Sequence, residues 1–341
     1  MPVRVERRGL SARLSSRHND RKENDMILVL SSNEDAHANM VLQRLAQLGH
    51  QATLVNLAEF PVHVRLAIGY SPGAPADHHL LLRDGTDLPL ASCGVVWWRR
   101  PQPFRIHAEI TDPAYREFAY SECFEAMNGL WLAVDAFWIN NPSRDADAAH
   151  KVYQLQVAQS VGLEIPTTQV TNDPQQARAF VEARGAERTV YKSFLATEQN
   201  WRETRVLKTH ELELLDAVRL APVIFQEYIP AQVDLRVTVI DRHIFAAAIH
   251  SQDTSYGVDY RMEMDQAQVE EHELPLEVVE RLHAFMDRLG LVYGAIDMRL
   301  TPDGRYVFLE VNPAGQWLFV EDRTGQPITD TFVQLLVERD Q

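Results

Sequence analysis

Residues 292–317 read VYGAIDMRLTPDGRYVFLEVNPAGQW, and the rest of the chain is best understood outward from this stretch. Apolar and polar residues alternate over 295–300 and again over 305–311, and Pro-Asp-Gly at 302–304 stands between the two runs. Alternation with a period of two is typical of strands with one buried face, and Asp-Gly is typical of a tight turn between antiparallel strands. The stretch therefore predicts a β-hairpin.

The turn decides which residues of the two strands face each other. If Asp303 and Gly304 are the two turn residues, one face of the hairpin is wholly apolar and can pack on a core. The pairs expected on that face are Ile296 with Val311, Met298 with Leu309, and Leu300 with Val307.

The other face of the predicted hairpin is charged. It sets Asp297 opposite Glu310, with Asn312 on the diagonal. Like charges placed opposite one another destabilise a sheet by up to about 1 kcal/mol unless a cation lies between them. Three oxygen ligands of this kind suit Mg²⁺ completed by water and phosphate oxygens. The alternative is a solvated face on which Arg299 or another Lys or Arg neutralises the carboxylates, and the hairpin alone leaves both interpretations open.

Composition narrows the class of protein. The chain has 341 residues, of which 45% are hydrophobic and 24% charged, which is ordinary for a globular protein of two or three packed units. A net charge of −15 argues against a general nucleic-acid binder or a protein of anionic membrane surfaces. The longest apolar run, residues 129–139, is too short to span a bilayer. Two cysteines provide neither a disulfide framework nor zinc spacing, so we expect a cytoplasmic protein.

Residues 1–25 differ in kind from the rest of the chain. They contain seven Arg or Lys residues and no apolar segment of the kind found in secretory signals. We expect either a disordered tail or a start placed too early, with Met26 as the true beginning.

From Met26 to residue 140 the chain reads as an α/β domain. A short apolar run at 26–30, a helix over 39–48 and a strand over 51–56 predict a βαβ unit. A later strand, VVWWRRP at 95–101, ends in Arg99 and Arg100. These arginines could face an anionic ligand or an acidic peptide, or they could stack on the tryptophans, and the sequence favours neither.

Two lysines lie in the next part of the chain. Asn-Asn-Pro-Ser at 140–143 marks a boundary and opens a long helix to residue 161, which carries Lys151. A strand over 189–194 carries Lys192. Lysine is a point charge suited to phosphate, but taken singly each lysine is more often a solvated surface residue.

A buried strand over 223–229 ends in a short polar turn, where exposed backbone groups could bind an adenine edge. Beyond it, Asp234 and Arg236 lie on one face of the following strand. Arg236 could grip a phosphate there, or the two residues could simply pair with each other.

These motifs, taken in order, resemble the ATP-grasp fold of ATP-dependent carboxylate ligases. Closer still, VVWWRRP, QEYIP followed by DLRV, HSQ with a later DYR, and FLEVNPAGQW together resemble the graspetide (microviridin-type) peptide ligases. The resemblance covers essentially Met26 to the C-terminus and implies an α/β (α+β ATP-grasp) architecture. Its expected parts are an N-terminal α/β pre-ATP-grasp domain over 26–140, a central ATP-grasp lobe over 141–230, and a C-terminal lobe with the metal site over 231–341.

The resemblance also implies roles for individual residues. Lys151 and Lys192 would contact the ATP phosphates. The hinge that holds adenine through its backbone would be formed by Gln226, Glu227, Tyr228 and Ile229, and Asp234 would lie near the nucleotide. Binding of two Mg²⁺ ions falls to Asp297, Glu310 and Asn312. Arg236 would steady the γ-phosphate or the acyl phosphate, and Arg299 and Arg261 are further candidates for binding anions. Residues 193–201 contain no glycine, unlike the phosphate-covering loop of many ATP-grasp enzymes, so no residue is assigned there.

The implied activity is ring closure in a ribosomally made precursor peptide. An Asp or Glu side chain is phosphorylated by ATP and then joined to a Ser or Thr hydroxyl or a Lys amine, and such enzymes tend to be homodimers. A second hypothesis is an ATP-grasp ligase that adds an amino acid to a small molecule or protein tail. A third is a non-catalytic relative, against which the many converging charges argue.

Overall fold

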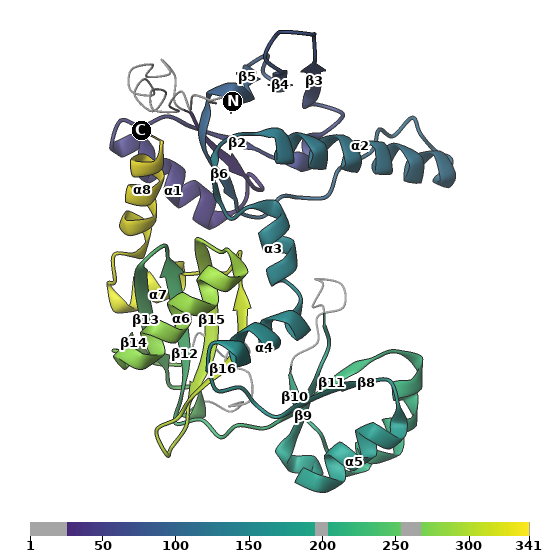
Figure 1. Cartoon of the computed structure of the whole chain (residues 1–341), viewed down its shortest axis with the longest axis vertical. Coiled ribbons are helices and arrows are strands. Elements are labelled where there is room, and N and C mark those ends of the chain that lie inside the picture. Colours follow the sequence, from purple (N-terminus) through teal and green to yellow (C-terminus); the bar gives the residue numbers. More distant parts are fainter. Residues whose placement is uncertain (1–25, 195–203, 254–266, 341) are drawn as a thin grey trace, which may run out of the picture.

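The computed structural model describes residues 26–194, 204–253 and 267–340, which form three parts along the long axis of the molecule (Figure 1). An N-terminal domain lies at one end, a lobe with α5 lies at the other, and a five-stranded sheet lies between them. Predictions for residues 1–25, for Arg261 and for most of 193–201 fall outside the described residues.

The N-terminal domain is built on a parallel sheet with strand order β2-β1-β6-β7. The apolar run at 26–30 becomes β1, in which four of five residues are buried. Asp35 caps the following helix by accepting hydrogen bonds from the backbone N–H groups of His37 and Ala38. The elements are β1 (Met26–Leu30), α1 (Ala36–Gln47), β2 (Ala52–Val55), η1 (Leu57–Glu59), an antiparallel sheet of β3 (Arg65–Gly69), β4 (Asp77–Leu81) and β5 (Asp87–Pro89), then η2 (Leu90–Ser92), β6 (Cys93–Trp98), α2 (Pro113–Ala133) and β7 (Phe137–Ile139).

Two helices follow, where the sequence pattern predicted one long helix over 143–161. They are α3 (Pro142–Ala148) and α4 (Lys151–Ser160), and the break falls at residues 149–150. The prediction was wrong because helix ends are recognised in a sequence mainly by Gly or Pro, and neither residue stands at this break. Lys151 is therefore the first residue of α4 instead of a residue inside a long helix.

The central lobe is an antiparallel sheet with strand order β10-β9-β11-β8, covered by α5 and a long 3-10 helix, η4. Its own apolar core includes Phe180, Leu215 and Phe225. The elements are β8 (Thr168–Thr171), α5 (Pro174–Arg184), η3 (Ala186–Arg188), β9 (Thr189–Lys192), β10 (Arg205–Val206), η4 (Thr209–Leu220) and β11 (Val223–Glu227).

The C-terminal sheet is antiparallel in the order β14-β13-β12-β15-β16 and includes the predicted hairpin. Helices α4 and α6 lie beside it, and the chain ends in two helices. No helix within the described residues is long and apolar enough to cross a membrane. The elements are β12 (Val233–Ile240), β13 (His243–Ile249), η5 (Ser251–Asp253), β14 (Val269–Glu271), α6 (Leu276–Leu289), β15 (Tyr293–Leu300), β16 (Tyr306–Asn312), α7 (Leu318–Thr324) and α8 (Ile328–Arg339).

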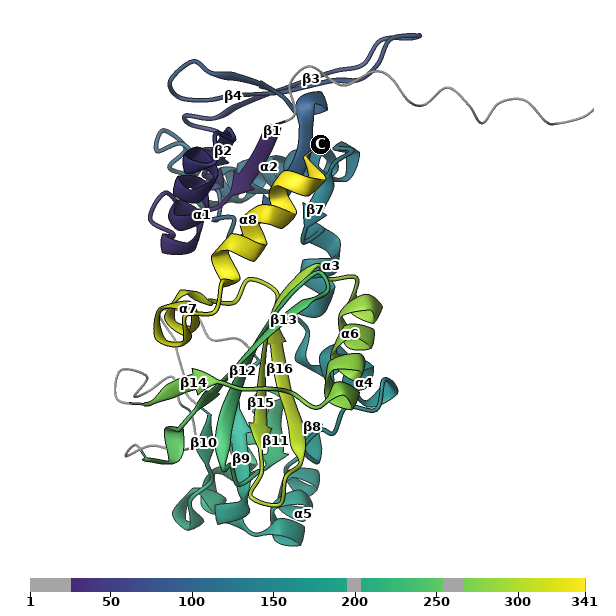
Figure 2. The same cartoon turned by 90° about the vertical axis from the view of Figure 1, so that its left-hand side faces the viewer.

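Helix α8 runs from the C-terminal sheet back to the N-terminal domain, where it lies beside α1 (Figure 2). One buried cluster contains Trp97 of β6, Trp317 and Phe332 of α8. The ring centroids of Trp97 and Phe332 are 4.7 Å apart, and those of Trp317 and Phe332 are 5.3 Å apart. The first and last parts of the chain therefore share one core.

Asn140, directly after β7, joins the N-terminal domain to the C-terminal sheet through hydrogen bonds of its buried side chain. Its Oδ1 accepts hydrogen bonds from the backbone N–H groups of Val292 (2.8 Å) and Tyr293 (2.9 Å), where β15 begins. Its Nδ2 donates to the carbonyl groups of Tyr293 (2.9 Å) and Pro313 (3.2 Å). This buried side chain fixes both ends of the hairpin against the end of β7.

His37 makes a second polar connection. Its Nε2 accepts from the backbone N–H groups of Trp317 (3.0 Å) and Leu318 (3.3 Å), which lie where α7 begins. Burial, followed by the charge of Arg99, lowers the pKa of His37 to about 3. The folded protein therefore holds the neutral ring, which is the form that can accept these bonds.

We expect Asn140→Ala to lower the free energy of unfolding by about 3 kcal/mol, because it leaves backbone groups at both ends of the hairpin without partners. Urea unfolding would measure this loss, and Asn172→Ala, at an exposed site, is the matched control. Equal stability of the two variants would contradict the role assigned to Asn140.

We expect the stability conferred by His37 to fall as the pH falls. Because the folded pKa of about 3 lies below the ordinary value of 6.5, the unfolded chain takes up a proton first as the pH drops through 6.5. The advantage of the wild type over His37→Gln in unfolding free energy should shrink by about 2 kcal/mol between pH 7.5 and pH 5. Chemical denaturation at both pH values tests this, with the exposed His210→Gln as control.

Candidate functional site

The predicted hairpin forms, and Asp297 lies directly opposite Glu310, as expected. The register beyond this pair was predicted wrongly, because the ladder shifts between Asp297 and Met298. The turn has three residues instead of two: the backbone N–H of Thr301 donates to the carbonyl of Arg305 (2.9 Å), and Gly304 takes a positive φ of 86°. Beyond the shift the observed pairs are Met298 with Phe308, Arg299 with Val307, and Leu300 with Tyr306.

Opposite charges alternate across the neighbouring strands β12 and β15. Asp234 lies opposite Arg299, and Arg236 lies opposite Asp297. Arg236 Nη1 donates to Asp297 Oδ1 at 2.8 Å, and Arg299 Nε donates to Asp234 Oδ1 at 2.8 Å. Asp234 and Arg236 do not pair with each other as one interpretation held, since each finds its partner on the next strand.

The Asp234–Arg299 pair is almost fully buried. Burial raises the pKa of Asp234, while Arg299 and the hydroxyl of Ser251, which donates to Asp234 Oδ2, act against that rise. Arg299 Nη1 also donates to the carbonyl of Ile229 (2.7 Å), and its guanidinium lies 5.4 Å from the ring centre of Tyr228. Arg299 thus holds the predicted adenine hinge against the C-terminal sheet.

The remaining hinge residues are held by the central lobe. The buried side-chain amide of Gln226 donates to Thr168 Oγ1 at 2.9 Å. The backbone N–H of Glu227 donates to the carbonyl of Thr167 at 2.8 Å. Lys192 is the last residue of β9 and lies opposite Ile224 of β11.

Lys151 and Glu310 form an ion pair that joins α4 to β16. Gln154, one turn further along α4, explains this placement. Its Oε1 accepts from the backbone N–H of Val311 (3.0 Å), and its Nε2 donates to the Val311 carbonyl (3.0 Å). Because Gln154 is buried and bonded to both backbone groups, it fixes α4 so that Lys151 meets Glu310.

The loop after β16 completes the site. Asn312 Oδ1 accepts from the backbone N–H of Ala314 (2.9 Å), and Arg236 Nη2 donates to the carbonyl of Gln316 (2.9 Å). A Cβ atom on Gly315 would lie 2.3 Å from that of Ala295 and 2.9 Å from Arg236 Nη2. Glycine is therefore required where the loop crosses over Arg236.

The oxygen atoms of this site fit the chemistry of Mg²⁺. Two carboxylates, Asp297 and Glu310, face each other beside the amide oxygen of Asn312, and few protein ligands plus phosphate and water are what Mg²⁺ prefers. Each carboxylate contacts a cation of the chain, Arg236 or Lys151. No cluster of three or more His, Cys, Asp or Glu side chains suited to a metal occurs within the described residues.

The two arginines after β6 differ in environment. Arg99 is buried, pairs with Asp35 (3.2 Å) and lies over Trp97 and Trp317. The packing interpretation thus holds for Arg99, which also donates to the Ala314 carbonyl at 2.6 Å. Arg100 is only half buried.

Sequence reasoning missed three residues that position the site: His37, Asn140 and Gln154. Each bonds to backbone groups more than 150 positions away in the chain, and backbone partners leave no trace in side-chain patterns.

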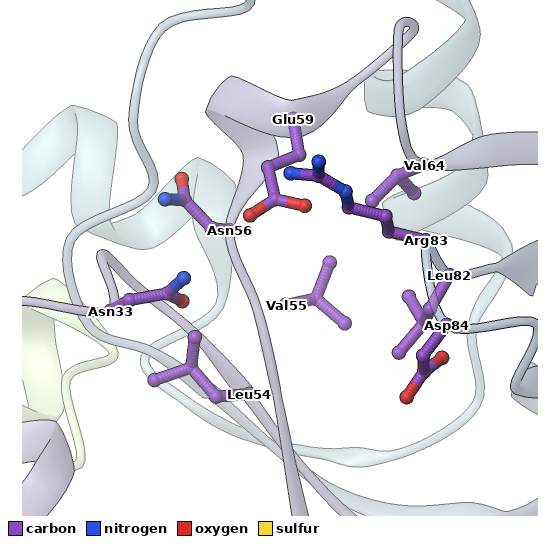
Figure 3. A pocket seen from close by; sticks show the side chains of 9 residues that line it. All are labelled: Asn33, Leu54, Val55, Asn56, Glu59, Val64, Leu82, Arg83 and Asp84. Atoms are coloured by element: carbon purple, nitrogen blue, oxygen red, sulfur yellow. The ribbon is translucent and has the colours of Figure 1, made fainter.

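Two open pockets lie apart from the charged face. One of about 470 Å³ lies at the carboxyl ends of β1 and β2, with Asn33, Asn56, Glu59 and Arg83 around an apolar floor (Figure 3). Another of about 500 Å³ lies between α4 and β8 and includes Thr167 and Thr168, which hold the hinge. None of the predicted site residues lines either pocket.

Comparison with known proteins gives two family matches. Residues 26–146 match the MvdD pre-ATP-grasp domain, and residues 148–336 match the RimK-like ATP-grasp domain. A search of curated proteins gives no significant match.

Solved structures with similar folds include the macrocyclase MdnC of Microcystis aeruginosa MRC bound to its precursor peptide MdnA (29% identity, 92% of this chain and 99% of that chain, TM-score 0.81). They include a Chryseobacterium gregarium RiPP-associated ATP-grasp ligase with ADP and a leader and core peptide (26%, 93% and 99%, 0.83). The macrocyclase MdnB of Microcystis aeruginosa MRC is also similar (28%, 92% and 99%, 0.77).

The resemblance inferred from the sequence motifs is confirmed, as is the predicted architecture of a pre-ATP-grasp domain followed by an ATP-grasp module. Because the second family match alone spans more than half of the sequence, this chain belongs to the RimK-like ATP-grasp family.

Proposed function

We propose that this protein is an ATP-dependent ligase that closes side-chain rings in a ribosomally made precursor peptide. The observation that carries the proposal is the charged face of β12, β15 and β16, on which Arg236, Asp297 and Glu310 lie together with Lys151. The likeness to ligases and macrocyclases that bind precursor peptides supports the choice of substrate.

The chemistry requires activation of a carboxylate, since an oxygen anion is a poor leaving group. The substrate's Asp or Glu side chain would attack the γ-phosphate of ATP, giving an acyl phosphate and ADP. A Ser or Thr hydroxyl, or a Lys amine, of the same peptide would then attack the acyl carbon, losing a proton while phosphate leaves. Bound Mg²⁺, expected as two ions, would neutralise phosphate charge during the transfer.

The residues of this chain divide that work among them. Lys151 and Lys192 would bind phosphate oxygens, and Lys151 would exchange Glu310 for phosphate as the nucleotide enters. The backbone of 226–229 would hold adenine, with Arg299 and Asp234 bracing that segment. Arg236, fixed by Asp297 and the Gln316 carbonyl, would steady the transferring phosphoryl group. Arg261 lies outside the described residues and stays a prediction.

Asp297, Glu310 and Asn312 would hold the metal in the C-terminal lobe over 231–341, which follows the central lobe over 141–230. We also propose that the enzyme works in the cytoplasm, in keeping with Cys93 and Cys123, which form no disulfide in the described residues.

Co-expression with a small peptide encoded next to this protein, followed by mass measurement of that peptide, tests the proposal. Loss of one water per ring supports macrocyclisation. An added amino-acid mass would instead support the second hypothesis, a ligase that extends a molecule or protein tail. An unchanged peptide, with ATP present and the enzyme folded, would contradict the proposal for that peptide.

We expect Glu310→Gln to abolish the ATP-dependent product while leaving the fold intact, because Glu310 is partly exposed and its loss removes a charge that the metal needs. Asp297→Asn is a poorer test, since it would leave buried Arg236 without its carboxylate and cost stability as well. Glu164→Gln, an exposed acid paired with Arg305 beside β16, is the matched control. Normal turnover by Glu310→Gln would rule out this metal site.

We also propose that the protein is a homodimer that pairs through α2. This helix reaches out from the N-terminal domain, and its exposed side chains include Tyr115 (70%), Phe118 (64%) and Leu132 (74%). Large apolar side chains exposed together on one helix are typical of an interface, and a second copy related by a two-fold axis would cover the same face on both chains.

Phe118→Glu should convert the dimer to a monomer of 38.9 kDa, because it places a charge in the middle of the apolar face. Light scattering with size-exclusion chromatography measures this. The control is Leu220→Glu, at a leucine on another surface that is even more exposed (76%), and it should leave the mass unchanged. A dimer that survives Phe118→Glu would place the interface on another surface.

A further inference from the structure

Arg100 is a half-buried arginine with few partners. Its Nε and Nη2 donate to the carbonyl of Ala314 at 3.3 and 3.2 Å. Within the described part of the chain, no carboxylate lies within ion-pair distance of Arg100, whereas its neighbour Arg99 pairs with Asp35. A guanidinium has five N–H donors, so most of the donors of Arg100 have no partner among the described residues.

Three arginines, Arg99, Arg100 and Arg236, lie near His37. Burial and then the charge of Arg99 lower the pKa of His37, and the charges of Arg100 and Arg236 lower it further. All three arginines are therefore close enough to act on the His37 ring. Two of them have carboxylate partners, Asp35 for Arg99 and Asp297 for Arg236. Within the described residues, Arg100 is the one of these three arginines that has no carboxylate partner.

A second unused donor lies on the neighbouring side chain. Arg99 is 1% exposed, and its Nη2 has no hydrogen-bond partner in the described ranges. Leaving a buried donor unsatisfied is costly in a folded protein, and an anion or a water beside this pair of arginines would relieve that cost.

The position of Arg100 relates it to the proposed ATP site. Ala314, whose carbonyl Arg100 contacts, donates its own backbone N–H to Asn312, the proposed metal ligand. Two residues further along, the Gln316 carbonyl anchors Arg236. Arg100 therefore stands beside the loop that links a proposed metal ligand to the proposed phosphate-binding arginine.

We propose that Arg100 binds the carboxylate that is to be phosphorylated, the Asp or Glu side chain of the substrate peptide. This inference rests on the proposed function and extends it to the acceptor. Arginine binds carboxylates through two parallel hydrogen bonds, which both hold and orient the group. The proposed function assigns Lys151, Lys192 and Arg236 to the phosphates, so the N-terminal domain would supply the carboxylate site and the ATP-grasp module the nucleotide site.

The test uses small probes in place of the unidentified peptide. N-acetyl-glutamate α-amide and its uncharged analogue N-acetyl-glutamine amide are titrated against the full chain with ADP and Mg²⁺ and followed by ligand-detected NMR. In Arg100→Gln, affinity for the glutamate probe should fall at least tenfold, while affinities for the glutamine probe and for ADP change less than twofold. Arg100→Lys, which keeps the charge but not the paired donors, should fall in between.

Arg105→Gln is the matched control, because it removes the same charge from an exposed position on the same segment. An unchanged affinity for the glutamate probe in a folded Arg100→Gln variant would overturn the proposal. Loss of inorganic phosphate or ADP binding without loss of glutamate binding would also overturn it, by assigning Arg100 to phosphate.

The outcome is separable from that of the proposed function. If no ligated peptide is found but the glutamate probe still depends on Arg100, the carboxylate site stands and the assigned reaction fails. If peptide ligation is found and neither the probe affinity nor the KM of the peptide depends on Arg100, the reaction stands and the carboxylate site fails.

Discussion

Arg236 and Asp297 lie directly opposite each other on β12 and β15, and their ion pair is almost wholly removed from water. A charge buried without its partner costs several kcal/mol. Removal of either side chain would therefore leave the other side chain with an uncompensated buried charge. The same guanidinium also holds the Gln316 carbonyl, which fixes the path of the loop after β16. This one guanidinium thus connects Asp297, a proposed metal ligand on β15, with the loop that follows β16.

The N-terminal domain contributes directly to that loop. Arg99 and Arg100 bond to the Ala314 carbonyl, Asn140 bonds to the Pro313 carbonyl, and His37 bonds to the backbone N–H of Trp317. These contacts sit above a shared apolar core that includes Trp97 and Phe332. The loop beside the proposed metal ligands is therefore shaped by both domains, and the ATP-grasp module does not build it alone.

The sequence was most informative where chemistry and periodicity coincide. The hairpin could be predicted because the alternation is strong in both strands. Asp297 faces Glu310 as predicted although the turn differs, because the register shift between Asp297 and Met298 offsets the extra turn residue. The register nearer the turn could not, since Pro-Asp-Gly is compatible with a two-residue or a three-residue turn and only the fold selects the latter. The break before Lys151 was invisible for a related reason: no residue type there forbids a continuous helix.

The candidate site was accessible from sequence mainly through its charged residues. Their order along the chain pointed to an ATP-grasp enzyme, and the structure brings Lys151, Arg236, Asp297 and Glu310 onto one face. Which cation meets which anion could not be predicted, because Asp234 and Arg236 each choose a partner more than 60 positions away. The roles of these residues toward ATP and metal stay predictions.

Gln154 has a consequence beyond its contact with Val311. β16 is the outermost strand of its sheet, and an outer strand exposes backbone groups that can recruit strands from other molecules. Gln154 occupies both groups of Val311, and the carbonyl of Glu164 takes the N–H of Phe308 at 2.8 Å. The side chain of Gln154 and the backbone of Glu164 thus make the hydrogen bonds that a further strand would make with β16 at these positions. Because those backbone groups are occupied, a strand of another molecule cannot pair with them and start aggregation.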